Sequence, residues 1–360
     1  MTHKKQKTVI VIGAGLGGLS AAISLAAKGF KVTVFEKNQR VGGKLNLLEK
    51  DGFRFDLGPS IFTLPQYFRR LWERGGQRME DHLTLEAVTP HWRNFFEDGT
   101  IFNLYMDSHL MRAELEKIGS AKLAKKFFRF LEYAGEQYEM LERGYFQAGL
   151  DTKKDFATFY DWKALLKMDY WRSMHGRLAT YFKNKHVLNV MEYFIKYVGS
   201  SALRAPGFMN LMPIIQFRYD LWYVTGGMYK LAVGLEELAR CSGVDFRLNT
   251  EVIGIDTDND RVQSVRTQDN ASHSADIIVS NMEVIPAYEK LLNEDATFLK
   301  TLKPFEPACS GLVLHLATDR TYPQLAHHNF FYARDQKKHF KSVFEQGRIP
   351  EDPTLYVVAP

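Results

Sequence analysis

The feature that most constrains the fold is a glycine-rich turn near the N-terminus, set between a strand-like and a helix-like segment. Residues 7–22 read Lys-Thr-Val-Ile-Val-Ile-Gly-Ala-Gly-Leu-Gly-Gly-Leu-Ser-Ala-Ala. A β-branched apolar run leads into G-x-G-x-x-G, and an Ala- and Leu-rich stretch follows it. This order predicts a strand, a tight turn and a helix, an arrangement that points the N-terminus of the helix at a pyrophosphate.

The three glycines of the motif and one acid have separate expected roles. Gly13 makes the turn, Gly15 lets the backbone approach a phosphate, and Gly18 lets helix and strand pack closely. The next strand, residues 31–36, ends in Glu36, eighteen positions after Gly18, where a carboxylate can bind ribose hydroxyls. A lone glycine motif is weak evidence. With the strand, the helix and the acid in place, it predicts a dinucleotide-binding site.

A second glycine pair follows in Arg40-Val41-Gly42-Gly43-Lys44, and after it comes the segment Phe55-Asp56-Leu57-Gly58-Pro59-Ser60. The pair offers another close backbone approach to a pyrophosphate, with a cation on each side. Together these segments resemble the flavin-dependent amine oxidase and carotenoid desaturase superfamily. The resemblance implies FAD as cofactor, bound by Gly13, Ala14, Gly15, Leu16, Gly17, Gly18, Glu36, Lys37, Arg40, Gly42, Gly43, Lys44, Gly58, Pro59, Ser60 and Val252.

Composition places the chain among ordinary globular proteins. Its 360 residues are 45% hydrophobic and 25% charged, enough for two packed units. The two cysteines, Cys241 and Cys309, do not form a disulfide framework and fit a reducing cytosol. We interpret the apolar run before Gly13 as a buried strand and not as a signal peptide. No stretch reaches eighteen uninterrupted apolar residues, so membrane contact would be peripheral.

Positive charge is concentrated in residues 153–197, which hold nine lysines and arginines against four acids. The same region is rich in Phe, Tyr and Trp. This mixture suits the headgroup zone of an anionic lipid surface, but it is equally compatible with a helical domain that has an aromatic core and a solvated lysine face. Nucleic acid is a less favoured partner, because no recognised binding module accompanies the charge.

Hydrophobic patterning indicates how the rest of the chain is organised. Residues 91–104 are predicted as two strands around Asp98-Gly99, and residues 108–200 as mainly helical. From residue 221 the pattern returns to strands, with a Gly-Gly turn, one helix and a buried strand at 275–281. With the resemblance, this predicts an α/β fold: a Rossmann-like FAD-binding domain with a helical, α+β substrate domain inserted. The predicted parts are residues 1–70 (first half of the FAD domain), 71–220 (helical substrate or membrane-associating region), 221–290 (second half of the FAD domain) and 291–360 (substrate-domain segment).

Later segments narrow the resemblance. Residues 193–201, 280–286 and 322–331 look like bacterial carotenoid desaturase relatives, and most like the diapocarotenoid branch that oxidises a terminal methyl group to an aldehyde. The resemblance implies a carotenoid substrate, with C30 diapocarotenoid chains favoured. A carotenoid desaturase, a flavin amine oxidase and a non-catalytic flavin-binding fragment stay open. Family members continue past residue 360, so the chain is interpreted as a fragment that lacks a C-terminal flavin segment.

No general acid or base is assigned from the sequence. His327 and His328 are adjacent in an apolar surround and could handle protons, although structural histidines are commoner. No metal-ligand spacing is present. A second G-x-G-x-x-G for a nicotinamide is also missing, so oxygen or a membrane quinone is the expected electron acceptor. The expected location is the cytoplasm, at the inner face of the cell membrane.

Overall fold

The protein divides into two compact units. The computed structural model describes residues 6–147, 149–150, 152–259, 261–305 and 310–360. Unit 1 comprises residues 1–86 and 222–307, and unit 2 comprises residues 87–221 and 308–360. The sequence predicts a flavin-binding or substrate-binding role for each of four parts of the chain. These roles stay predictions.

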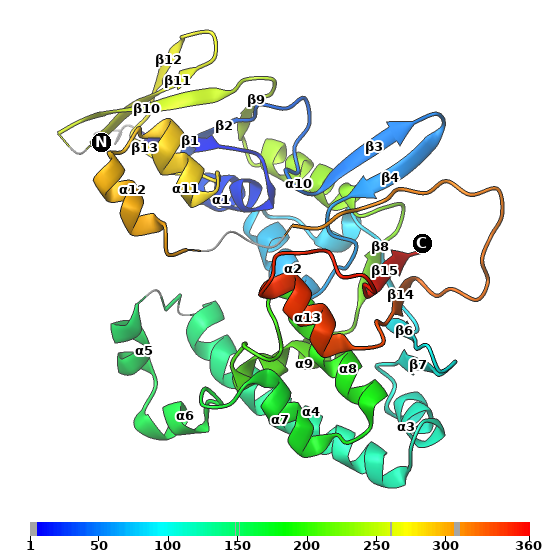
Figure 1. Cartoon of the computed structure of the whole chain (residues 1–360). Helices are drawn as coiled ribbons and strands as arrows, with labels where there is room; N and C mark the ends of the chain where they lie inside the picture. Colours follow the sequence, from blue (N-terminus) through cyan, green and yellow to red (C-terminus); the bar gives the residue numbers. More distant parts are fainter. Residues whose placement is uncertain (1–5, 148, 151, 260, 306–309) are drawn as a thin grey trace. The chain divides into compact units, whose positions relative to one another are not determined.

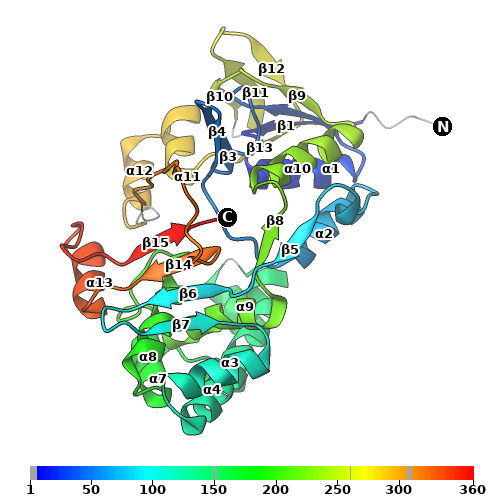
Figure 2. The same ribbon diagram turned by 90° about the vertical axis from the view of Figure 1, so that its right-hand side faces the viewer.

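A parallel four-stranded sheet forms the centre of unit 1 (Figures 1 and 2). Its strand order is β13-β1-β2-β9, and every neighbouring pair is parallel. The helices α1 and α10 pack against each other beside it. This confirms the predicted Rossmann-like class and the return of the strand near residue 280 to a parallel sheet. The elements are β1 (Thr8–Ile12), α1 (Leu16–Ala26), β2 (Lys31–Phe35), α10 (Tyr229–Cys241), β9 (Asp245–Arg247) and β13 (Ile277–Ser280).

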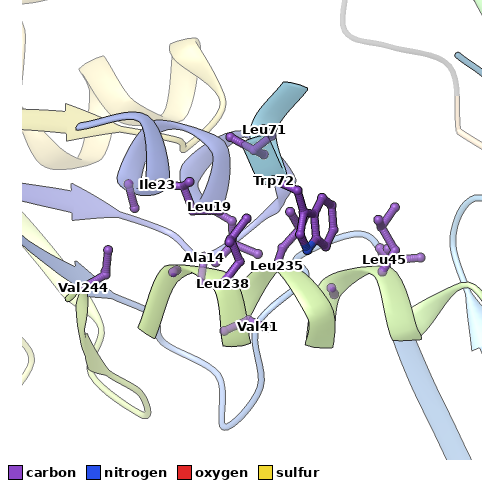
Figure 3. Packing of buried hydrophobic residues seen from close by; sticks show 14 of the residues in the cluster. Ala14, Leu19, Ile23, Val41, Leu45, Leu71, Trp72, Leu235, Leu238 and Val244 are labelled. Carbon is purple, nitrogen blue, oxygen red and sulfur yellow. The ribbon is translucent and has the colours of Figure 1, made fainter. Parts of the chain in front are cut away.

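The core of unit 1 lies between the sheet and these helices (Figure 3). Leu19 and Ile23 of α1 face Leu235 and Leu238 of α10, and all four side chains are fully buried. The indole of Trp72, from α2 (Pro65–Arg74), is fully buried in the same cluster. Burying each of these side chains contributes about 1.5–3 kcal/mol, so the cluster fixes α1 and its preceding turn on the sheet.

Smaller elements complete unit 1. The hairpin of β3 (Asn46–Lys50) and β4 (Phe53–Leu57) was not predicted, although Asp51-Gly52, both with positive φ, is a typical two-residue turn. Asn259-Asp260 in the sequence also predicts a turn; Asn259 has φ 47°, and residue 260 lies outside the described part. The others are η1 (Met79–Asp81), β5 (Leu85–Ala87), β8 (Trp222–Val224), β10 (Val252–Asp258), β11 (Arg261–Thr267), β12 (Ser272–Ser274), α11 (Val284–Pro286), η5 (Ala287–Leu291) and α12 (Ala296–Leu302).

Unit 2 combines a four-stranded mixed sheet with helices. The sheet order is β15-β14-β6-β7 (Figure 2), from β6 (Trp92–Phe95), β7 (Ile101–Leu104), β14 (His328–Phe331) and β15 (Leu355–Val358). The predicted hairpin at 91–104 is confirmed as β6 and β7, and Gly99 in its turn has φ 80°. The sequence did not predict that β14 pairs in parallel with β6.

The helices of unit 2 begin mostly at side-chain caps. Asp107, Ser120, Asp161, Ser173 and Asn184 each accept hydrogen bonds from first-turn amides. No helix among the described residues is long and apolar enough to cross a bilayer. The helices are α3 (Ser108–Lys117), α4 (Ala121–Leu141), η2 (Glu142–Phe146), α5 (Lys153–Phe159), α6 (Trp162–Lys167), α7 (Met174–Tyr181), α8 (Lys185–Tyr193), η3 (Phe194–Tyr197), η4 (Gly207–Leu211), α9 (Met212–Tyr219) and α13 (Gln336–Phe344).

Candidate dinucleotide-binding site

The first glycine turn joins β1 to α1 at the carboxyl end of the sheet. Gly13 has φ +93°, a conformation that side chains rarely adopt, and its amide donates to the carbonyl of Phe35 at 2.8 Å. A Cβ at Gly18 would lie 2.0 Å from the carbonyl oxygen of Gly13. The turn and the first turn of α1 are therefore in direct backbone contact. Gly15 is the N-cap of α1, and no side chain caps the first amides, which suits an anion.

Glu36 holds this turn against the end of β2. One carboxylate oxygen accepts from the amide of Ala14 at 2.7 Å, and the other accepts from the amide and side chain of Asn38 at 2.9 and 2.7 Å. The residue is only 5% exposed. A carboxylate has about four acceptor positions, so three are used by the chain and one remains for a ribose hydroxyl.

The second glycine pair lies directly on the first turn. The amide of Gly42 donates to the carbonyl of Ala14 at 2.8 Å, and Gly15 and Gly42 form an isolated parallel bridge. A Cβ at Gly43 would lie 3.0 Å from Cα of Gly15. The structure thus brings together two backbone segments that the sequence separates by more than twenty residues. Backbone without side chains therefore lines both turns, which is what the close approach of a pyrophosphate needs, so these residues fit a dinucleotide.

The two cations beside the glycine pair have carboxylate partners. Arg40 pairs with Glu49 at 3.3 Å, and Lys44 pairs with Glu283 at 2.9 Å. The hydrogen bond from Lys44, together with its charge, holds the pKa of Glu283 below its usual value. Both pairs lie at the surface, where an ion pair contributes little stability, so either cation can exchange its partner for a phosphate. Lys37, just after β2, is exposed.

The segment that follows β4 also lies against the second glycine segment. A Cβ at Gly58 would lie 2.0 Å from the carbonyl oxygen of Lys44, whereas Pro59 is exposed and Ser60 is half-buried. Asp56, from the same motif, accepts from the amides of Met228 and Tyr229 at 2.7 and 3.0 Å. Its carboxylate therefore holds the start of α10.

Val252 and Asn281 approach the site from the second half of unit 1. Val252 is buried at the start of β10, and the amide of Thr250 donates to the carbonyl of Glu36 at 2.9 Å. Asn281 follows β13, and its side-chain amide lies where a Cβ on Gly15 or Gly17 would meet it, at 2.8 or 2.5 Å. Sequence reasoning did not single out Asn281 as a site residue. Its position after a buried strand of the parallel sheet was the available signal.

The histidine pair lies in unit 2. His328 is fully buried in β14, and its Nδ1 lies 2.8 Å from the hydroxyl of Tyr356. Burial lowers the pKa of both His327 and His328, so both are neutral near pH 7. Among the described residues no cluster of His, Cys, Asp or Glu could hold a metal ion. Cys241 is a free, exposed thiol, and Cys309 lies outside the described residues.

Comparisons with known proteins show the family to which the chain belongs. Residues 16–352 match the family of flavin containing amine oxidoreductases. The chain is 51% identical over 361 residues to a 4,4'-diapolycopene oxygenase of a Methylomonas species, covering 100% of this chain and 72% of that protein. It is 42% identical over 356 residues to a 4,4'-diaponeurosporene oxygenase of Staphylococcus haemolyticus, covering 98% and 70%.

Solved structures share the fold at low sequence identity. A fatty acid isomerase from P. acnes that produces CLA superposes with a TM-score of 0.56 at 17% identity, covering 82% of this chain and 64% of that one. A putrescine oxidase bound to putrescine gives a TM-score of 0.52 at 17% identity, covering 79% and 60%. These two likenesses support the fold alone.

Proposed function

Since this chain belongs to the family of flavin-containing amine oxidoreductases, we propose that it uses FAD to oxidise a carotenoid. The most specific form of the proposal is oxidation of a terminal methyl group of a C30 diapocarotenoid to the aldehyde, as a step of carotenoid biosynthesis. The observation that carries it is 51% identity along the whole chain to a 4,4'-diapolycopene oxygenase. The chain is thus a flavin-dependent oxidoreductase, and its substrate class follows that relative.

The choice of FAD rests on the two glycine segments. Gly15 and Gly43 bring bare backbone together where a pyrophosphate can approach it closely, and Glu36 retains one acceptor position for a ribose hydroxyl. Arg40 and Lys44 supply positive charge beside that space. When bound, a flavin accepts a hydride equivalent from an activated carbon. Flavin released from the purified protein and identified by chromatography should be FAD; FMN alone would contradict the assignment.

Pigment analysis in a bacterial host that makes diapocarotenoids tests the reaction. Expression of the chain should yield a carotenoid aldehyde in place of the terminal methyl compound. A product with one more double bond and no oxygen would identify a desaturase instead. An unchanged pigment from a well-folded chain that binds flavin would leave a non-catalytic flavin protein.

We propose further that the helical part of unit 2 contacts a membrane from its cytoplasmic side. Trp162 and Leu166 of α6 are 68% and 65% exposed, and Trp171 just after it is 82% exposed. Lys163 and Lys167 lie on the same short helix and are also exposed. Exposed rings beside lysines suit an anionic headgroup layer, where an apolar substrate and a quinone acceptor would also be found.

Vesicle sedimentation tests the membrane contact. The protein should pellet with vesicles that contain anionic lipid, and a Trp162→Ala/Trp171→Ala double variant should pellet several-fold less. Phe53→Ala is the matched control, because Phe53 is a 49% exposed ring in the β3–β4 hairpin of unit 1. Equal pelleting of all three proteins would refute this surface, and activity in detergent-free buffer on a dissolved substrate would argue against any need for a membrane. We also propose that oxygen or a quinone accepts the electrons of the reduced flavin. The rate of flavin reoxidation, measured with each acceptor in turn, distinguishes the two.

A further inference from the structure

Lys196 of η3 lies in a box of aromatic rings within unit 2. Its Nζ atom is 4.2 Å from the ring centroids of Phe330 and Tyr356, 4.8 Å from that of Trp92 and 5.1 Å from that of Tyr197. Phe330 and Tyr356 are opposite each other on β14 and β15, and their rings stack at 4.6 Å. The ring of Trp92, from β6, lies 4.5 Å from that of Phe330. One face of the sheet therefore builds most of the box.

Within the part of the chain that the structure describes, the amine in this box has no anionic partner. No Asp or Glu among the described residues forms an ion pair with Lys196, and burial lowers its pKa from 10.5 to about 7. The ring faces attract the ammonium form by about 0.5–2 kcal/mol, so the box can hold either protonation state. Lys196 is half-buried and the adjacent Tyr197 is 37% exposed, so the box lies near the surface of unit 2.

The titratable groups around Lys196 do not offset the lowering of its pKa. Burial raises the pKa of Tyr197, whose hydroxyl accepts from Gln216 at 2.6 Å. His328 is held neutral by burial and contacts the hydroxyl of Tyr356. His91, just before β6, pairs with Asp220 at 2.6 Å. None of them supplies a carboxylate directly to Lys196.

We propose that Lys196 is a carbonyl-binding amine that forms a reversible imine with the aldehyde end of a polyene, whose first carbons lie against the partly exposed rings of Tyr197 and Tyr356. The inference rests on the proposed function, because a polyene aldehyde is the product of that reaction. Desolvated lysines in apolar pockets are typical imine formers. Such a bond would hold the product until water releases it.

The chemistry needs no further reactant. The lone pair of the neutral Nζ attacks the carbonyl carbon, and a carbon–nitrogen bond forms. The carbonyl oxygen then leaves as water with the two hydrogens of the amine, and a C=N bond replaces the C=O bond. No electrons are gained or lost, and the reverse hydrolysis restores aldehyde and amine.

Trapping with cyanoborohydride tests the proposal on the whole chain. The protein is incubated with all-trans-retinal as a polyene aldehyde probe, reduced, digested and analysed by mass spectrometry. At pH 7.5 an amine with pKa about 7 is on the order of several hundredfold richer in its neutral form than an ordinary lysine. The adduct should therefore form first on Lys196. Its rate should rise with pH and be half-maximal near pH 7.

Two variants sharpen this test. Lys196→Arg keeps a cation among the rings but cannot form the imine, so it should lose the adduct. Lys163→Arg is the matched control, because Lys163 is exposed and lies 5.7 Å over a single ring, that of Trp162; it should keep the adduct on Lys196. Labelling spread evenly over exposed lysines, or a rate that rises only above about pH 9, would overturn the proposal.

The wild-type labelling pattern and its pH profile suffice if Lys196→Arg does not fold. The outcome is also separable from the proposed function, because the probe is supplied from outside and needs no flavin turnover. Aldehyde pigment in the host without any adduct on Lys196 would refute the imine alone. An adduct without carotenoid oxidation would refute only the proposed function.

Discussion

Gly15→Ala should weaken flavin binding with little loss of stability, whereas Gly18→Ala should destabilise the fold. Gly15 has φ −68° and ψ 173°, which alanine adopts freely. Its Cβ would lie 2.8 Å from the side-chain nitrogen of Asn281, the flexible end of an exposed side chain, and 3.9 Å from Cα of Gly43. At Gly18 the new atom would lie 2.0 Å from the carbonyl oxygen of Gly13, so α1 would have to move away from β1.

These geometries set the expected magnitudes. Gly15→Ala should cost less than about 1 kcal/mol of unfolding free energy, because Asn281 can rotate away, whereas Gly18→Ala should cost about 3 kcal/mol or more. Under the proposed function a phosphate approaches the bare backbone of Gly15, and the methyl would block that approach. Losing one charge-assisted hydrogen bond there costs about 1.5–3 kcal/mol, which is about 10- to 150-fold in the dissociation constant of FAD.

Two measurements on purified protein decide the matter. Calorimetry without flavin should place the unfolding midpoint of Gly15→Ala near that of wild type and that of Gly18→Ala roughly 6–12 °C lower. Titration of FAD, followed by quenching of flavin fluorescence, should show the affinity loss in Gly15→Ala. Gly311→Ala is the control, because nothing lies within 4 Å of its Cβ. Unchanged FAD affinity in Gly15→Ala, or an unchanged midpoint in Gly18→Ala, would refute the reasoning.

Three further outcomes follow from the packing and charges. Leu235→Ala, at a fully buried position of α10, should cost about 2–5 kcal/mol in denaturant unfolding, while Val233→Ala, 37% exposed on the same helix, should cost far less. Asp56→Ala should lower the free energy of unfolding by about 1–3 kcal/mol, because two amides at the start of α10 lose their acceptor. Between pH 7 and 10.5 the unfolded chain protonates Lys196 and the folded chain does not, so wild-type stability should rise with pH there. Urea unfolding at both ends of that window should show a smaller rise in Lys196→Met, and an equal rise would contradict the lowered pKa.

Local sequence patterns predicted the part of the site formed by the first glycine turn and Glu36. Gly13, Gly18 and Glu36 lie within one strand–helix–strand unit, so their spacing alone predicts that they meet. The structure places Gly18 against Gly13, and Glu36 on the amide of Ala14 in the same turn. The Asp-Gly turn at 98–99 likewise predicted its hairpin. The turn at Asp51-Gly52 carried the same signal for β3 and β4, and the hairpin could have been predicted from it.

The remaining features of the fold and of the sites depend on pairing between strands that are far apart in the sequence. No local sequence pattern predicts such pairing. Asn281 reaches the glycine turn only because β13 pairs with β1. The box around Lys196 needs β6, β14, β15 and η3 together, and β14 reaches β6 from far along the chain. None of these segments by itself indicates that its aromatic side chains meet those of the others. Only the sheet order shows that an unpaired amine lies among four rings.

The pairing of β1 with β13 has a consequence for synthesis on the ribosome. The hydrogen bonds between Thr8 and Asp276 at the ends of these strands join residues 268 positions apart. At about 5–20 residues per second, roughly 15–50 s pass between the emergence of the two strands. During that time β1, an almost wholly apolar strand, has one edge without its final neighbour. The parallel sheet of unit 1 is therefore completed only after residues 277–280 have been synthesised, late in translation.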